Sequence, residues 1–138
     1  MAAETYTFQI ESQGDGDSHD ITGLVKEQLE NSQISAGILS VFTASSTSAI
    51  TTIEYESGAL ADFQRMFNEI AAQNRHYEHN ARWGDGNGHS HVRAALLGPS
   101  LSIPIVGGKL TLGTWQQIVF IDFDNKARLR EMIVQIVG

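Results

Sequence analysis

The N-terminal segment 5–10 alternates apolar and polar residues, which is the pattern of a half-buried β-strand. Runs rich in β-branched residues predict two more strands, over 37–43 and 48–55. The C-terminal third adds four strand-like segments, and Gly107–Gly108 suits a tight hairpin between the first two of them. These four segments are 101–106, 109–113, 114–123 and 131–137.

Helical spacing of apolar residues predicts helices between these strands. The first helix runs from Asp20 to about Asn31, and the second begins at Ser57 as its N-cap. The stripe of the second helix that should be buried consists of Leu60, Phe63, Phe67 and Ile70. A third helix follows a polar connector over 74–88 and stops at Gly98–Pro99. The apolar face of this third helix consists of Val92, Ala95 and Leu96.

The order of these elements contains no βαβαβ alternation, so the sequence predicts an α+β fold. We expect a mixed, mainly antiparallel sheet with helices packed on one face, in a single domain over 1–138. Segment 114–123 has apolar residues on both faces, so helices or a neighbouring subunit should cover both. Trp115 is expected in the core, and Gln116 or Asp122 would need polar partners if buried. Turn-rich residues 13–20 are expected to be a connector.

The net charge of −7 argues against a general binder of nucleic acid or anionic membranes, because such proteins need basic patches. No stretch approaches the ~18 apolar residues of a membrane span, and no signal-peptide pattern opens the chain. The absence of cysteine excludes disulfides, thiolate metal sites and a cysteine nucleophile. We therefore expect a cytoplasmic protein.

Four of the five histidines cluster within sixteen residues: His76, His79, His89 and His91. Together with Asp85 they offer nitrogen and oxygen ligands for a divalent ion such as zinc, although they match no standard zinc signature. Solvated loop histidines are the alternative interpretation. His89 and His91 are two residues apart and would lie on roughly opposite sides of a helix, so they cannot chelate one ion through adjacent turns.

The junction between the glycine-rich loop and the third helix also suits an anion. The first turn of a helix has free N–H groups, and glycines such as Gly88 let the backbone approach a ligand closely. Arg93 could supply a bidentate phosphate contact. The hydroxyl cluster 45–47 could also hydrogen-bond a phosphate, although hydroxyl-rich turns are common. Glu54 is either an exposed residue at a strand end or a metal ligand or general base.

Two runs near the C-terminal half, GHSHVRAALLGPS and GKLTLGTWQ, closely resemble the YjbQ-like family, also called the secondary thiamine-phosphate synthase family. The likeness extends from about residue 4 to the end of the chain. It implies an α+β fold assembled as a homotrimer, with a polar cleft between subunits. It also implies thiamine-phosphate synthase activity, which joins a pyrimidine methyl diphosphate to a thiazole phosphate and releases diphosphate. Such a reaction calls for phosphate-binding donors and a divalent ion.

The positions that match characteristic residues of this family are His79, His91, Glu54 and Gln116. Ser45 departs from the family pattern, because many members have a histidine there. We hypothesise that His89 replaces that histidine as a metal ligand. A double change of Ser45 to His and His89 to Ala would then preserve metal binding.

The sequence thus predicts a small homotrimer that binds a phosphorylated metabolite at a histidine-rich site between subunits. The expected divalent metal, zinc or magnesium, is bound by His79, His89 and His91. The residues assigned to catalysis are Glu54, Asp85 and Gln116. The residues assigned to phosphate binding are Gly88, Arg93, Ser45 and Thr47. A non-catalytic binding module and a metal-dependent hydrolase with Glu54 as base both stay open, because no nucleophile–base pair is readable in the sequence.

Overall fold

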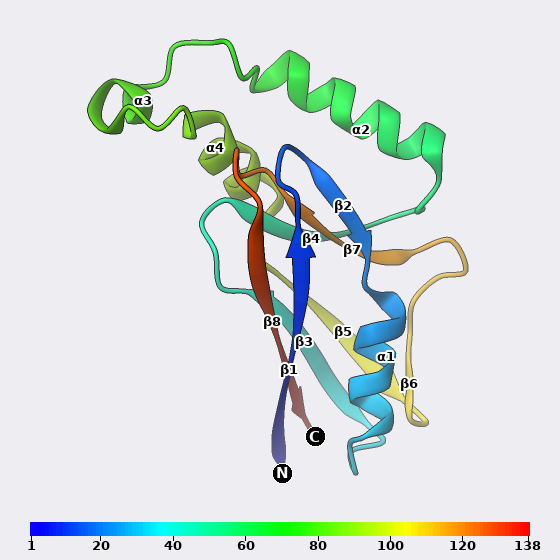
Figure 1. Ribbon diagram of the computed structural model, residues 1–138. Coiled ribbons are helices and arrows are strands. Elements are labelled where there is room, and N and C mark those ends of the chain that lie inside the picture. Colours follow the sequence, from blue (N-terminus) through cyan, green and yellow to red (C-terminus); the bar gives the residue numbers. More distant parts are fainter.

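The computed structural model describes residues 1–138 and contains two antiparallel sheets and four helices (Figure 1). The larger sheet has five strands in the order β1-β8-β3-β5-β6. Its strands are β1 (Ala3–Ser12), β8 (Arg128–Val137), β3 (Gly37–Thr43), β5 (Ser100–Val106) and β6 (Lys109–Leu110). The sequence-based prediction of an α+β fold built on antiparallel strands is confirmed.

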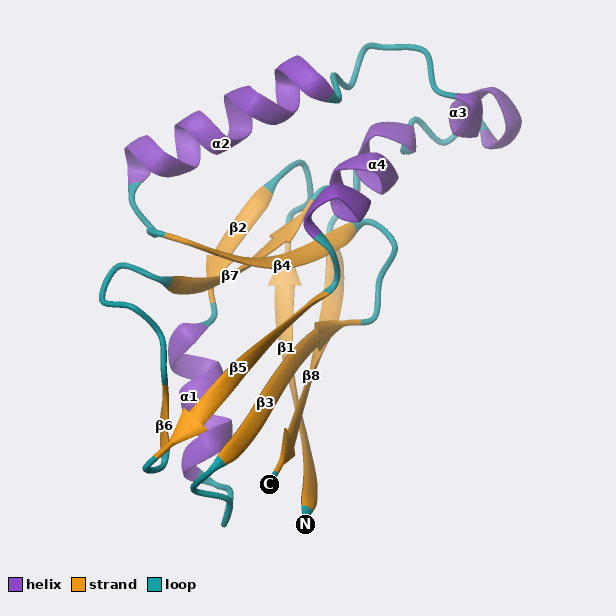
Figure 2. Ribbon diagram, turned by 180° about the vertical axis from the view of Figure 1, so that it is seen from behind, coloured by secondary structure: helices purple, strands orange, loops and turns teal.

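The smaller sheet has the order β2-β7-β4 and lies across one end of the larger one (Figure 2). Its strands are β2 (Asp17–Asp20), β7 (Gln117–Asp122) and β4 (Ser48–Ile53). The helices are α1 (Thr22–Glu30), α2 (Ser57–Ile70), α3 (Glu78–Trp83) and α4 (Gly88–Leu97). None of these helices is long and apolar enough to cross a membrane.

Two apolar clusters form the core, one on each side of the smaller sheet. The larger cluster joins α1 to the inner face of the five-stranded sheet and includes Ile118 and Phe120 of β7. The smaller cluster joins α2 and α4 to the other face of β7, through Val119 and Ile121. The prediction that both faces of this strand are covered is therefore confirmed, and helices and the larger sheet provide the cover.

Several local predictions were wrong, and each has a physical reason. The connector 13–20 contains β2, whose backbone pairs with β7 although its side chains are polar. The connector 74–88 contains α3, a helix without a single buried residue and therefore without an apolar period. Trp115 is 71% exposed, because β7 begins only at Gln117 and the indole precedes the buried strand.

The N-terminus of α2 also differs from the prediction. Glu56 and not Ser57 is the N-cap, and its carboxylate accepts hydrogen bonds from the amides of Gly58 and Ala59. Of the predicted apolar stripe only Phe67 is fully buried, and Ile70 is 49% exposed. The helix is thus covered by its own chain over only part of its apolar face.

Helix α4 is oriented opposite to the expectation from its apolar pattern. Val92 and Leu96 were predicted to face the core, but they are 43% and 60% exposed. The buried positions are instead His89, Ser90 and Arg93, with Ala94 as the apolar exception. Hydrogen bonds and the packing of Ala94 and Leu97 in the smaller cluster hold the helix to the body of the protein, whereas Val92 and Leu96 face outward.

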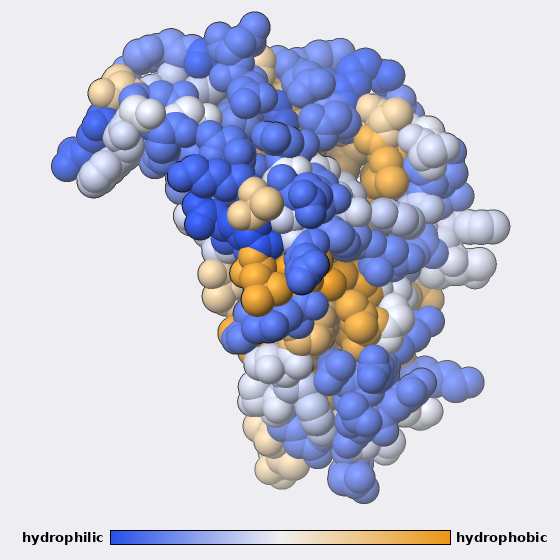
Figure 3. Space-filling model, viewed as in Figure 1, coloured by the Kyte–Doolittle hydropathy of each residue, from blue (hydrophilic) through white to orange (hydrophobic).

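A further hydrophobic area lies on the face of the molecule drawn in Figure 1. Hydrophobic surface gathers there in the middle, over β1 and toward α1 (Figure 3). Tyr6, Phe8 and Ile10 of β1 pack against the larger core cluster but stay only partly buried. The chain alone therefore leaves apolar surface exposed both here and on α4.

Candidate functional site

Two of the three histidines predicted to bind a metal, His79 and His91, meet where α3 packs against α4. The ring centroids of His79 and His91 lie 4.3 Å apart, with the planes tilted by 43°. Helix α3 ends at Gly84, whose φ of 66° turns the chain back, and Asp85 follows at once. The Oδ1 atom of Asp85 lies 3.3 Å from Nδ1 of His79. Three of the residues singled out from the sequence thus form one cluster.

A pocket of about 330 Å³ lies beside this pair. Its lining includes Ser45 and Ser46 of the loop between β3 and β4, Ser48 at the start of β4, and His91 and Ala95 of α4. The fold therefore brings two segments together that are more than forty residues apart in the sequence. The lining combines serine hydroxyls with an imidazole and contains no carboxylate.

Hydrogen bonds to the end of β7 fix the start of α4. The hydroxyl of Ser90 is 2.5 Å from the Phe123 carbonyl oxygen and 2.6 Å from Oδ1 of Asn87. The side-chain amide of Asn87 donates to Oδ1 of Asp124 at 3.2 Å. All three polar residues are buried, so α4 and His91 are tied to the sheet by a continuous polar network.

Asp124 is the centre of this network and is only 2% exposed. Its carboxylate accepts from five donors: Thr47 Oγ1, Asn87 Nδ2, the Lys126 amide, Arg128 Nε and Arg130 Nη2. Burial alone would raise the pKa of Asp124, but the hydrogen bonds from Asn87, Thr47 and Arg128 outweigh it and lower the pKa below 3.8. The charged carboxylate thus joins the β3–β4 loop to α4, and so holds both walls of the pocket.

His89 lies away from this pocket. The residue is 2% exposed, its ring centroid is 6.5 Å from that of Tyr77, and its Nε2 is 3.4 Å from Ser90 Oγ. Burial, and secondarily the charge of Arg93, lowers the pKa of His89 below 6.5, so the imidazole is neutral at pH 7. Its position on the far side of α4 from His91 agrees with their spacing of two residues.

Three of the predicted phosphate-binding groups make contacts within the chain. The Gly88 amide donates to Oδ1 of Asn80 at 2.8 Å, and a Cβ at this glycine would lie 2.4 Å from Cβ of Tyr77. Arg93 is 4% exposed and donates from Nε to the Ala71 carbonyl at 3.0 Å, which fastens α4 to the end of α2. Thr47, predicted in the same role, is buried against Asp124.

Glu54 and Gln116 lie at the other end of the smaller sheet. Glu54 follows the last residue of β4, whereas Ser48 of the pocket is the first, so the two ends are about 20 Å apart at the usual rise of a strand. The Glu54 side chain is exposed and makes no hydrogen bond within the chain. Gln116 accepts from the Gly113 amide and donates to Thr52. A single chain therefore does not bring these two residues to the histidines.

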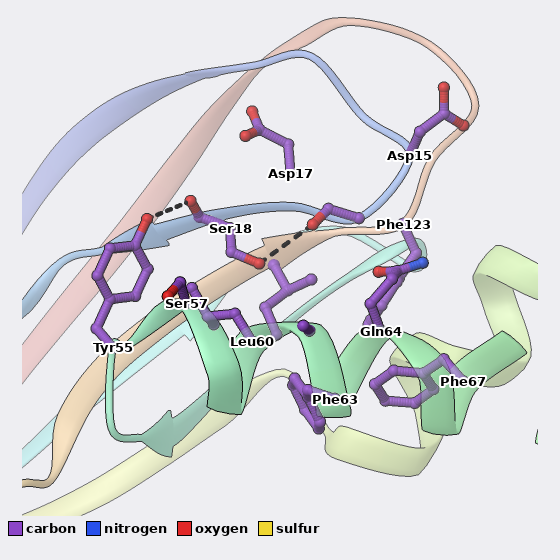
Figure 4. A pocket seen from close by; sticks show the side chains of 13 residues that line it. Asp15, Asp17, Ser18, Tyr55, Ser57, Leu60, Phe63, Gln64, Phe67 and Phe123 are labelled. Atoms are coloured by element: carbon purple, nitrogen blue, oxygen red, sulfur yellow. Dashed lines mark hydrogen bonds between the residues drawn. The ribbon is translucent and has the colours of Figure 1, made fainter.

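A larger pocket of about 590 Å³ lies between α2 and β2 (Figure 4). Leu60 and Phe63 of α2 line one side, and Asp15 and Asp17 lie on the other. None of the residues that the sequence marks as functional lines it. Of these two pockets, only the smaller one is lined by predicted functional residues, namely Ser45 and His91.

Comparison with known proteins identifies the family of the chain. A family model described as UPF0047 protein YjbQ-like matches residues 6–138. A UPF0047 protein of Methanothermobacter thermautotrophicus is 44% identical over 119 residues, which are 86% of this chain and 81% of that protein. The chain belongs to the YjbQ-like family. The resemblance that the sequence motifs indicated is thereby confirmed.

Solved structures of YjbQ-like proteins have the same fold. A YbjQ-like protein of unknown function from Sulfolobus solfataricus superposes with a TM-score of 0.94 at 32% identity, covering 99% of this chain and 98% of that one. A hypothetical protein from Aeropyrum pernix K1 gives a TM-score of 0.90 at 32% identity, covering 98% of each chain. This chain thus shares its fold with both solved structures.

Within one chain of this YjbQ-like protein, the predicted metal ligands do not all come together. His79 and His91 are the only imidazoles that come together, and no group of three His, Cys, Asp or Glu side chains is placed to hold an ion. His89 does not join this pair, because it is buried and its spacing of two residues from His91 puts it on another side of α4. Ser45 lines the same pocket as His91, and a serine hydroxyl is not among the usual zinc ligands.

Asp124 and Ser90 are the site residues that sequence reasoning missed in this YjbQ-like chain. The sequence offered one signal, since Asp122 among apolar neighbours required a partner. That partner is Arg130, whose Nε lies 2.8 Å from Oδ2 of Asp122. Arg130 also contacts Asp124, so the partner that Asp122 requires is itself part of the polar network.

Proposed function

We propose that this YjbQ-like chain forms a small cytoplasmic homotrimer that takes a phosphorylated metabolite between subunits, at the pocket that His91 lines beside His79. The observation that carries the proposal is the outward apolar face of α4. Val92 and Leu96 lie on the same helix as His91, and exposed apolar patches of this kind mark association surfaces. A neighbouring subunit seated on this helix would also close the adjacent pocket.

Glu54 and Gln116 enter the site in this arrangement only from the neighbouring subunit. They lie at one end of the smaller sheet and the histidines lie at the other. A head-to-tail contact joins different surfaces of two copies and closes into a ring when the rotation permits. Such a contact places Glu54 of one chain beside the His91 pocket of the next.

The reaction that the family resemblance implies is thiamine-phosphate synthesis. The pyrimidine methylene carbon loses diphosphate, which departs with the electron pair of the C–O bond, and the ring nitrogen of the thiazole phosphate forms the new C–N bond. Ser45, Ser46 and His91 would hold phosphate oxygens, and the Asp85 contact would orient His79. Donors aimed at the leaving diphosphate stabilise the charge that develops on it.

Binding without turnover is the second candidate function, and one observation favours it. The hydroxyl and imidazole that come close in the chain are those of Ser90 and His89, at 3.4 Å, and both residues are buried. Because both residues are buried, Ser90 and His89 cannot act on a substrate as nucleophile and base. A phosphometabolite-binding module would need only the pocket.

Mixing two inactive variants tests the proposed function. His91→Ala and Glu54→Ala chains are unfolded together, refolded as mixed oligomers and assayed for thiamine phosphate from the two precursors. Each variant alone should be inactive, whereas random mixing should restore about a quarter of the wild-type activity, because one interface in four combines both intact residues in a head-to-tail ring.

Restoration would contradict a site within one chain, and its absence would contradict the shared site. A wild-type protein that binds a precursor but forms no product would favour the binding module. The molar mass from light scattering gives the subunit number independently of activity. His76→Ala is the matched control, because this histidine is 72% exposed and paired only with Glu78.

A further inference from the structure

We infer that Trp115 of one subunit seats against the exposed face of α4 in the next subunit and anchors the head-to-tail contact between them. The partner that covers this face is thus a second copy of the chain. This inference rests on the proposed homotrimer, and it names the side chain that joins its subunits and the surface that receives it. The receiving surface consists of Val92, Ala95 and Leu96.

Trp115 projects from a turn that the chain holds in one conformation. The amide of Gln116 donates to the Gly113 carbonyl at 3.1 Å, and the Gly113 amide donates to Oε1 of Gln116 at 3.0 Å. Nε2 of Gln116 donates to the hydroxyl of Thr52 at 3.2 Å, which ties the turn to β4. The backbone that carries the exposed indole is therefore fixed before any contact forms, and this lowers the entropy cost of docking.

The exposed face of α4 matches this indole in chemistry. Val92 and Leu96 are four residues apart, so their side chains are neighbours along the helix. Ala95 beside them is also exposed, and its small methyl group leaves room for a large flat ring. A tryptophan seated there would bury roughly 150–250 Å² of apolar surface, which is enough to dominate a contact. Because Ala95 also lines the pocket of His91, the same indole would cover one edge of that pocket.

Both surfaces are free of exposed charge, although the chain carries a net charge of −7. Segment 110–118 contains no charged residue, and the one charged residue of α4, Arg93, is buried. Two acidic copies can therefore meet at these surfaces without like charges facing each other, and depletion of charge is typical of interface cores. Glu54 lies two residues beyond Thr52 on the tryptophan side, so its carboxylate would approach the side of α4 that carries His91.

The two surfaces lie on opposite sides of the molecule. In Figures 1 and 2 the loop between β6 and β7, which carries Trp115, projects on one side of the smaller sheet, and α4 lies on the other. The chain therefore cannot cover its α4 with its own indole. A ring of copies in head-to-tail contact covers every α4 with the indole of a neighbour and leaves neither surface unpartnered.

Chemical cross-linking is a sharp test, because the native chain has no cysteine. Thr114→Cys and Ala95→Cys place one exposed thiol at each surface of the same chain, which is then treated with a short bifunctional maleimide. A head-to-tail ring joins unlike positions, so this double variant should give covalent species of up to three chains on a denaturing gel, and each single variant should give none. Ala95→Cys with Val106→Cys is the matched control and should also give none, because exposed Val106 lies at the β5–β6 hairpin.

Fluorescence reports the surroundings of the indole without a change at the interface. Trp83→Phe leaves Trp115 as the only tryptophan, and its emission should be blue-shifted and poorly quenched by acrylamide in the assembled protein. Both properties should revert when dilution separates the chains. Trp115→Ala should weaken each contact between neighbours about 30-fold or more, as the loss of an interface hot spot does. Val106→Ser should leave the assembly unchanged by light scattering, and circular dichroism melts confirm that each variant folds.

The results separate this inference from the proposed function. A homotrimer by light scattering in which Trp115 is fully quenched and the double cysteine variant gives no covalent species would overturn the inference and leave the assembly in place. A folded Trp115→Ala that assembles as tightly as the wild-type protein would do the same. A wild-type protein that stays a single chain would overturn both. Cross-linking as expected, without product from the thiamine precursors, would support the inference and reject the reaction alone.

Discussion

Replacing Asp124 with Asn should destabilise the protein strongly, because this carboxylate joins both walls of the pocket to the sheet. An amide is nearly isosteric with a carboxylate but presents an NH2 group in place of one oxygen. Oδ2 receives Thr47, Arg128 and Arg130, and Oδ1 receives Asn87 and the Lys126 amide. Whichever way the amide turns, at least two donors face its NH2 group.

The cost follows from the burial of these groups. Leaving a buried donor without an acceptor costs about 1–3 kcal/mol, and breaking a buried ion pair by removing one partner costs about 3–5 kcal/mol. Arg130 keeps its contacts with Asp122, so we expect a loss of about 3–4 kcal/mol in the free energy of unfolding. With an unfolding entropy of about 0.3 kcal/mol per kelvin for 138 residues, Tm should fall by about 10–14 °C.

The assay is thermal and urea unfolding followed by circular dichroism, and Asp62→Asn is the matched control. Asp62 pairs with Arg65 at 2.9 Å, but both side chains are about two-thirds exposed. An exposed pair of this kind contributes about 0–1 kcal/mol, so the control should barely shift. If Asp124→Asn lowers Tm no more than Asp62→Asn does, the network does not hold the pocket walls and the reasoning is refuted.

Three further outcomes are expected. The wild-type protein should lose stability as pH falls below 6.5, because His89 takes up a proton more readily in the unfolded chain than in its buried native position. His89→Gln should remove this part of the pH dependence, measured by urea unfolding from pH 7.5 to 5. Gly88→Ala should lower the free energy of unfolding by about 1–3 kcal/mol, because the new Cβ would lie 2.4 Å from Cβ of Tyr77. Gly23→Ala is the control, and it should raise the free energy of unfolding by about 0.5–1 kcal/mol because the space around this residue of α1 is open. Equal effects of the two changes in the same assay would contradict the steric account. Val92→Ser with Leu96→Ser should reduce the molar mass from light scattering to the single-chain value of 15.1 kDa, and an unchanged mass would exclude this face from the interface.

The sequence predicted the fold well where hydrophobic periodicity reports burial. Strand β1 alternates and pairs along its whole length with β8, and β7 is apolar on both faces and buried on both. Gly107 and Gly108 both have positive φ, as the predicted hairpin turn requires. In each case the residue pattern and the tertiary environment demand the same structure, so a local rule is sufficient.

Prediction failed where polar contacts and not apolar burial place the chain. β2 is held by backbone hydrogen bonds to β7, which leave no trace in side-chain periodicity. α3 has no buried face, so its six residues read as a loop. The sequence also joined Glu54 and Gln116 to the histidines through the family pattern. Within one chain, Glu54 and Gln116 lie at the opposite end of the smaller sheet from the histidines. No local sequence rule predicts that separation.

The orientation of helix α4 links the candidate site to the proposed assembly, because it both positions His91 and exposes Val92 and Leu96. A Leu and a Val facing water forgo about 1.5–3 kcal/mol each of available burial, while the same helix buries His89, Ser90 and Arg93 against polar partners. Turning the helix by half a revolution would satisfy the apolar pattern and break every one of those bonds. The observed orientation retains these hydrogen bonds, and it places His91 in the same pocket as Ser45 and Ser46. In the proposed homotrimer, a neighbouring subunit seated over α4 would regain this burial and would also close the pocket.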